Sequence, residues 1–304
     1  MPGEAGCPTE PRQTPCLAKL DRLGWSVWFS FECFGARFGV RSNDPELLER
    51  IRERLPPGSR NDPGRKIVDV LISARRAAPS SRPGLRGFHL LYLSIRRVER
   101  TVDLEQILEA FDQHIHLLVA AFARRHAFVH AGCVAWRGRA ILIPGRTLAG
   151  KSTLVHALVE AGAEYLSDEY AVVDARGRVR AYPKLLSLRA SEGRPARLLA
   201  PERARDWASP AVPVGLVAAV RFTKTGRGRW RTLTPAEAVL ELLGNTVSVR
   251  RNPALAMRFI PLALRQARAV KGTRGEAGSV ATRLLALADA GGAMAAGHAK
   301  KQRR

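Results

Sequence analysis

The order of hydrophobic and polar residues predicts a small α+β module near the start of the chain. Residues 25–41 alternate apolar residues with small or polar ones around turn glycines, which is typical of a β-hairpin. A helix is predicted from Asn43-Asp44-Pro45 to about Leu55, because the first two residues can cap a helix and proline fits its first turn. The remaining predicted elements of this module are strands at 66–73 and 88–97 and a loop at 75–87.

A long amphipathic helix is predicted to follow. Between Asp103 and about Arg125, apolar residues recur at the three- and four-residue spacing of one helix face. Residues 128–136 then alternate, and residues 139–143 form a short apolar run, so that two strands of a buried sheet are predicted. The later predicted elements are a strand at 214–222, a helix from the cap Thr234 to about Leu243, and helices near 253–268 and 279–289 that cover the sheet.

These patterns divide the chain into four predicted segments. Residues 1–20 are proline-rich, polar and aperiodic, and we expect them to be disordered. The α+β module takes residues 21–100, and a larger α/β domain takes residues 101–292, with the helix at 103–125 linking the two. Residues 293–304 are predicted to form a basic, solvated tail.

The most informative local pattern lies between the strand at 139–143 and the helix that begins near Thr153. Residues 145–152 fit G-x-x-x-x-G-K-[ST], the phosphate-binding loop that joins a strand to a helix. In such a loop, backbone N–H groups and the positive end of the helix hold the β-phosphate, Lys151 reaches the β- and γ-phosphate oxygens, and Ser152 offers a hydroxyl to Mg²⁺. The residues predicted to contact a nucleoside triphosphate are Gly145, Arg146, Thr147, Leu148, Ala149, Gly150, Lys151, Ser152 and Thr153. The alternative is a glycine turn between a strand and a helix that binds no phosphate.

Acidic residues follow at a distance that returns the chain to this loop. A helix of about a dozen residues carries the chain roughly 18 Å away, and a strand of about five residues brings it roughly 16 Å back. Asp168 and Glu169 are therefore predicted to lie level with Lys151, whereas Asp174 would overshoot. The alternative is that the two acids are only the polar end of a strand. No cluster of histidines or cysteines has the spacing of a metal site, so the only metal expected is the ion bound with the nucleotide.

Composition adds less than the charge suggests. The net charge of the 304 residues is +23, which would suit a nucleic acid or an anionic membrane, but the arginines are dispersed and no nucleic-acid-binding pattern accompanies them. The four cysteines lack the spacing of a disulfide framework or a metal site, which favours a reducing compartment. With neither a signal peptide nor a run of 18 apolar residues, the chain is predicted to be cytoplasmic and free of membrane-spanning segments.

Together, His130-Ala131-Gly132, the loop at 145–152 and Leu166-Ser167-Asp168-Glu169 resemble the catalytic domain of HPr kinase/phosphorylase and related serine kinases, whose core is similar to that of PEP carboxykinase. The resemblance covers roughly residues 125–190. It implies an α/β P-loop catalytic domain behind the small α+β module, ATP and Mg²⁺ as cofactors, and phosphoryl transfer to a hydroxyl. Asp168 would be the general base, Glu169 would lie near the metal with Ser152, and His130 would orient an acid. The two acids could exchange roles.

Some residues depart from the family pattern. Leu148 stands where the family carries a further glycine, and no downstream glycine-rich arginine signature is evident; its nearest counterpart is Arg189, which follows Leu186-Ser187-Leu188. HPr itself is therefore not the expected substrate. The predicted phosphoacceptor is a protein, a peptide or a small molecule, with serine as the first choice, and a homo-oligomer is left open. The alternatives are a nucleotide-responsive binding protein with lost or weak catalysis and, less favoured, a basic nucleic-acid-binding protein.

Overall fold

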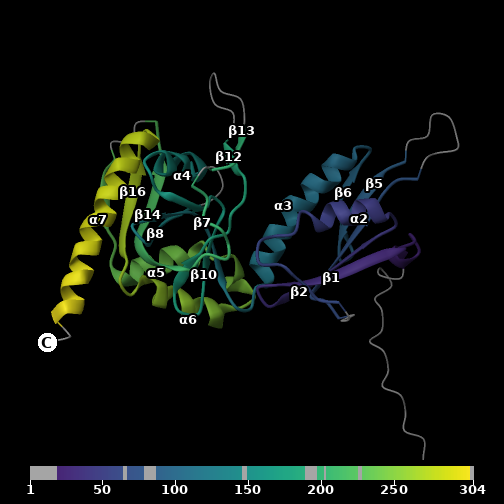
Figure 1. Cartoon of the computed structure of the whole chain (residues 1–304), viewed down its shortest axis with the longest axis horizontal. Helices are drawn as coiled ribbons and strands as arrows, with labels where there is room; N and C mark the ends of the chain where they lie inside the picture. Colours follow the sequence, from purple (N-terminus) through teal and green to yellow (C-terminus); the bar gives the residue numbers. More distant parts are fainter. Residues whose placement is uncertain are drawn as a thin grey trace, which may run out of the picture. The chain divides into compact units, whose positions relative to one another are not determined.

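The computed structural model shows a mixed α/β protein (Figure 1). It describes residues 19–63, 67–78, 87–145, 149–188, 197–201, 203–224 and 228–301, with the backbone alone at 187–188, 197–199 and 291–301. The chain divides into two compact units, residues 1–117 and 118–304, and the division falls within helix α3 (Leu104–Phe122). Residues 1–18 of the segment predicted to be disordered, 1–20, lie outside the described residues; residues 19 and 20 are helical, and Leu20 is buried.

The first unit is built on a six-stranded sheet in the order β3-β1-β2-β4-β5-β6. Its strands are β1 (Val27–Cys33), β2 (Ala36–Ser42), β3 (Arg60–Asn61), β4 (Val70–Arg75), β5 (His89–Leu93) and β6 (Arg96–Thr101). The predicted hairpin is confirmed, because β1 pairs with β2 in antiparallel register around a tight turn. The predicted helix is α2 (Pro45–Arg52), whose first turn is capped by the Asp44 side chain accepting the Leu47 N–H at 2.7 Å.

One strand prediction in this unit is wrong. Residues 88–97 were expected to be a single strand, but they belong to two strands, β5 and β6, which form an antiparallel hairpin. The turn between them places Ser94 at a φ of 53°, a left-handed conformation that glycine or asparagine usually marks in a sequence. Because neither residue is present at this turn, the sequence carries no signal for it.

The second unit contains an eight-stranded sheet in the order β11-β10-β7-β8-β14-β16-β15, with β9 paired to β7. Its strands are β7 (Ala127–Trp136), β8 (Arg139–Pro144), β9 (Glu164–Ser167), β10 (Tyr170–Val173), β11 (Arg178–Arg180), β14 (Val212–Phe222), β15 (Trp230–Thr232) and β16 (Arg268–Arg274). Strands β8, β14 and β16 are parallel neighbours, and β11 pairs with both β10 and β14, which folds the sheet back on itself. A separate two-stranded sheet joins β12 (Leu186–Leu188) to β13 (Arg197–Leu199).

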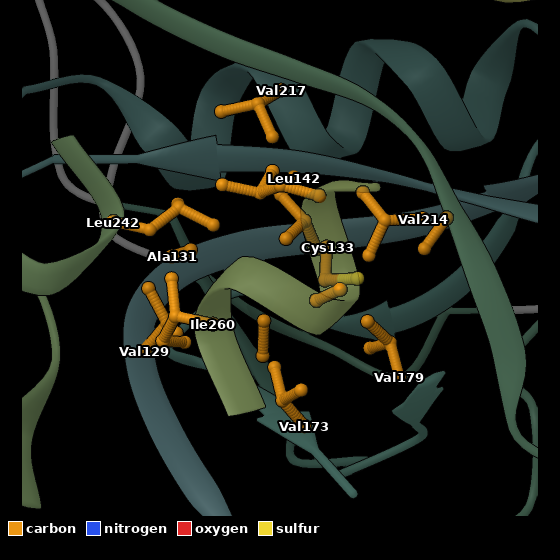
Figure 2. Packing of buried hydrophobic residues seen from close by; sticks show 14 of the residues in the cluster. Val129, Ala131, Cys133, Leu142, Val173, Val179, Val214, Val217, Leu242 and Ile260 are labelled. Atoms are coloured by element: carbon orange, nitrogen blue, oxygen red, sulfur yellow. The ribbon is translucent and has the colours of Figure 1, made fainter. Parts of the chain in front are cut away.

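Helices cover both faces of this sheet, because alternate residues of its strands are buried on each side. On one face, α5 (Pro235–Gly244) and α6 (Pro253–Leu264) pack on a core centred on Val129, Ala131 and Cys133 of β7 (Figure 2). On the other face, α4 (Lys151–Glu160) and α7 (Ala277–Lys301) pack on residues such as Val134 and Ile141. The α5 helix begins as predicted, with Thr234 and Glu237 forming a reciprocal capping box.

The C-terminal prediction needs two corrections. The helix expected near 253–268 ends at Leu264, and residues 268–274 form strand β16 instead. Parallel pairing with β14 buries Ala269 and Val270, so tertiary packing decides a segment whose own pattern is too short to predict a strand. Helix α7 extends beyond the predicted 279–289 and continues to Lys301, so most of the expected tail is helical in the backbone.

Gly132 on β7 lets helix α4 lie unusually close to the sheet. A Cβ atom at this position would stand 2.5 Å from Cγ2 of Val155 and 3.7 Å from Cβ of Lys151, both on α4. Real Cβ contacts are not that short, so any larger residue would push α4 or β7 away. The first turns of α4 therefore lie against the middle of β7.

Replacing Gly132 by alanine should destabilise the protein by about 1–3 kcal/mol, because the new methyl group overpacks the contact with Val155. Chemical denaturation of the full chain measures this change. The double variant Gly132→Ala/Val155→Ala should lose less than the sum of its two single variants, since the smaller residue makes room. Gly244→Ala is the control, because no atom lies within 4 Å of its Cβ position. Additive losses in the double variant would contradict the packing account.

Candidate phosphate-binding site

The site is built where strand β8 passes into helix α4. Gly145 follows β8 directly, and Gly150 caps α4 in a left-handed conformation with a φ of 79°. Among the described residues, no side chain caps the first turn of α4, which leaves its N–H groups suited to an anion. Arg146, Thr147 and Leu148, three of the predicted contact residues, lie outside the described residues.

Lys151 folds back over the described end of this loop. Its side chain is only 8% exposed, and its Nζ donates a hydrogen bond to the carbonyl oxygen of Gly145 at 2.9 Å. The ammonium group thus lies beside the loop at the positive end of α4. Two positive features at one place create a field that attracts an anion.

The two predicted acids lie between β9 and β10, which run one after the other along β7. Ser167 pairs with Cys133 and Tyr170 pairs with His130, so Asp168 and Glu169 occupy the gap beside Gly132 and Ala131. The Ser167 hydroxyl accepts the N–H groups of Glu169 and Tyr170, which shapes the turn that carries the acids. Asp174 lies at the far end of β10, where it accepts the N–H groups of Arg176 and Arg178, so it has a structural role.

Asp168 makes a direct hydrogen bond to the start of helix α4. The Ser152 hydroxyl, in the first turn of α4, donates to Oδ2 of Asp168 at 3.0 Å. The Tyr165 hydroxyl lies 3.1 Å from Oδ1 of Asp168 and 2.9 Å from the carbonyl oxygen of Lys184. Each carboxylate oxygen of Asp168 therefore has a hydroxyl partner, and the side chain is held in one orientation.

Burial raises the pKa of Asp168 above its usual value, because the side chain is only 8% exposed and the charged form loses water. The hydrogen bonds from Ser152 and Tyr165 oppose this shift, Glu169 adds to it, and Lys184 opposes it. Asp168 is consequently a better proton acceptor near neutral pH than an exposed aspartate.

The other two predicted catalytic side chains have different surroundings. Glu169 is half-buried and accepts the Lys184 ammonium group at 3.0 Å. His130 lies with its ring 6.1 Å from that of Tyr170, and within the described chain no hydrogen bond joins this ring to Asp168 or Glu169. Burial, together with the nearby Lys151 ammonium, lowers the pKa of His130, so this histidine is neutral at pH 7.

Three side chains of the site were not anticipated from the sequence. Tyr165 was assigned only to a strand, and Lys184 lies in an irregular segment with no pattern of its own. Arg274 reaches the site from β16, where its Nη2 donates to the carbonyl oxygen of Gly150 at 2.6 Å. The only apolar residues of this strand are the adjacent pair Ala269-Val270, which is too short a pattern to reveal it from the sequence.

A comparison with protein-family models gives no match, and a comparison with curated proteins also gives none. Within the described ranges, no group of three or more histidine, cysteine, aspartate or glutamate residues is arranged to hold a metal ion. No described helix is long and apolar enough to cross a membrane. What the site can do chemically therefore rests on its own geometry: positive groups at the start of α4, and a buried carboxylate in contact with a helix hydroxyl.

Asp168→Asn should raise the melting temperature of the ligand-free protein near neutral pH. Since burial raises the Asp168 pKa, the folded state holds its proton more tightly than the unfolded chain, and the ionised form costs stability. We expect a gain of about 2–4 °C, the shift that 1 kcal/mol produces in a domain of this size. The gain should shrink as the pH falls from the raised folded-state pKa toward about 4, the unfolded value.

Asp174→Asn is the matched control for this measurement. Asp174 is as buried as Asp168, but it pairs with Arg178 and accepts two backbone N–H groups. Its replacement should lower the melting temperature. If Asp168→Asn and Asp174→Asn lowered the melting temperature equally at every pH, Asp168 would be an ordinary structural carboxylate.

Proposed function

We propose that this protein is an ATP-dependent kinase with a P-loop catalytic domain of the HPr kinase and PEP carboxykinase type. It would transfer the γ-phosphate to a hydroxyl group, with a serine of a protein or peptide as the first choice and a small molecule as the second. One observation carries the proposal. The 3.0 Å contact between Ser152 and Asp168 joins the predicted phosphate loop to the predicted acid pair, two features about 16 residues apart in the chain.

The binding half of the proposal rests on the start of α4. The triphosphate would lie against the open N–H groups after Gly150, with the Lys151 ammonium turning from the Gly145 carbonyl to the phosphate oxygens. Lys151 is well suited to this exchange, because a backbone carbonyl is a weaker partner for an ammonium group than a phosphate is. The cytoplasmic location expected from the sequence forms part of the same proposal.

The donor set at the site fits Mg²⁺, which prefers oxygen ligands and usually retains several waters when it binds with phosphates. The Ser152 hydroxyl and the carboxylates of Asp168 and Glu169 would hold it. When bound, the ion supplies positive charge against the phosphoryl oxygens during transfer. Lys184 already provides one positive partner for Glu169, so the two acids are not equivalent.

Asp168 would act as the general base, because burial raises its pKa and makes it a stronger proton acceptor than an exposed aspartate. In the transfer, a bond forms between the acceptor oxygen and the γ-phosphorus, and the bond to the β–γ bridging oxygen breaks with its electron pair left on ADP. The acceptor proton passes to the Asp168 carboxylate. Tyr165 and Ser152 would keep that carboxylate aimed at the acceptor.

Calorimetric titration of Mg-ATP into the full chain tests the proposal. The wild-type protein should bind with micromolar affinity, and Lys151→Ala should weaken binding by roughly 10- to 100-fold, the loss of a charged hydrogen bond. Lys271→Ala is the control: Lys271 is exposed and pairs with Glu241, so this variant should bind as the wild type does.

The catalytic step is tested by the Asp168→Asn variant. It should lose phosphoryl transfer, measured as ATP consumption in the presence of candidate acceptors, while Mg-ATP still binds because Ser152 and Glu169 would continue to hold the ion. Transfer that survives in Asp168→Asn would make the protein a kinase with another base, whereas binding without any transfer by the wild type would favour a nucleotide-responsive binding protein. No binding by the wild type would overturn the proposal.

A further inference from the structure

Arg274 stands at the edge of the sheet where the phosphate loop begins. It is the last residue of β16, which runs parallel to β14, which in turn runs parallel to β8. The carboxyl ends of these three strands meet at one edge, the position where open α/β sheets bind ligands. The loop after β8 and the side chain at the end of β16 therefore share this edge, although more than 120 residues separate them in the chain.

The Arg274 side chain holds the cap of helix α4. It is only 2% exposed, and its Nη2 donates to the carbonyl oxygen of Gly150 while its Nη1 donates to that of Gly275. A Cβ atom at Gly150 would stand 2.5 Å from Nη2, so this contact also requires glycine at the cap. The guanidinium thus fixes the residue whose left-handed conformation aims the first N–H groups of α4.

The charge and donors of Arg274 are not fully satisfied. Its Nε is buried and has no hydrogen-bond partner in the described part of the molecule. None of its described contacts is an ion pair, and burial lowers its pKa while only Glu276 opposes that shift. A buried arginine without an ion-pair partner is costly, and within the described chain its charge is offset only by the Coulombic attraction of Glu276 and by the Phe222 ring, whose centroid lies 5.3 Å from Cζ.

The position of this charge is also unusual. A cation next to the positive end of a helix is unfavourable, and here Arg274 and Lys151 both lie at the start of α4. An anion at that point would relieve the repulsion among the Arg274 guanidinium, the Lys151 ammonium and the positive end of α4. The spare N–H donor of Arg274, and a charge that forms no ion pair in the described chain, therefore point to a phosphate group as a further partner.

We propose that Arg274 is a positioning residue for the phosphate cradle, fixing Gly150 and supplying buried positive charge behind the bound phosphates. The inference rests on the proposed nucleotide-binding function and deepens it, since it assigns a loop-holding role to a residue outside the loop. It requires phosphate affinity to depend on a side chain of β16. The nucleoside part of the ligand should not matter to this dependence.

Calorimetric titration with both Mg-ATP and inorganic pyrophosphate tests this role in the full chain. Arg274→Met should weaken the binding of both ligands by roughly 10- to 100-fold, the factor expected for a lost charged hydrogen bond. Arg274→Lys should restore part of the loss, because it retains the charge but not the fork of donors. Arg268→Met is the control: Arg268 is exposed and begins the same strand, about 20 Å from Arg274 along β16, so binding should remain within twofold.

Melting temperatures separate positioning from a general effect on folding. The rise on adding pyrophosphate, taken for each variant against its own ligand-free value, should be smaller in Arg274→Met than in Arg268→Met. If Arg274→Met does not fold, Arg274→Lys is compared with Arg268→Lys instead. Arg274→Lys should then bind pyrophosphate at least threefold more weakly than Arg268→Lys. Equal binding within either pair overturns the inference while leaving the cradle intact; a wild type that binds neither ligand overturns the proposed function and the inference together.

Discussion

The site depends on the close approach of helix α4 to strand β7 at Gly132. Without a side chain at that position, the first turns of α4 lie against the middle of the strand. The segment carrying Asp168 runs along the same strand, so the acid and the Ser152 hydroxyl meet at 3.0 Å. A larger residue at 132 would separate the two halves of the site even if every site residue were present.

The charged groups gathered there are held at some cost to stability. Burial raises the pKa of Asp168 and lowers that of Arg274, so each shift marks a charged form that the fold disfavours. Lys151 is also buried, and its ammonium group donates to the carbonyl oxygen of Gly145. Asp174, a structural carboxylate in the same unit, is well compensated, because it forms an ion pair with Arg178 and accepts two backbone N–H groups. Buried Asp168, Lys151 and Arg274 converge on one helix end, and buried charged groups gathered in this way are typical of a ligand site.

The core of the site could be predicted because its signals are local. The strand, glycine loop and helix around residues 145–152 follow one another in the sequence, and simple reach along a helix and a strand places Asp168 level with Lys151; the contact of Asp168 with Ser152 is what the structure adds. Strand β16 could not be predicted in that way, because its burial comes from parallel pairing with β14, about 50 residues earlier. Arg274 was missed with it. The β5–β6 turn was missed because Ser94 adopts a left-handed conformation without a glycine or asparagine. Tyr165 and Lys184 converge on the acids through tertiary contacts that no spacing reveals.

Amide hydrogen exchange with and without Mg-ATP tests the central claim most directly, because it locates the bound phosphates on the backbone. The account predicts slower exchange at the amides of residues 149–154, at the start of α4, together with the end of β16 that holds Gly150. Slower exchange confined to residues 229–231, where two arginines flank Trp230, or no change at the start of α4 at saturating Mg-ATP, would contradict it.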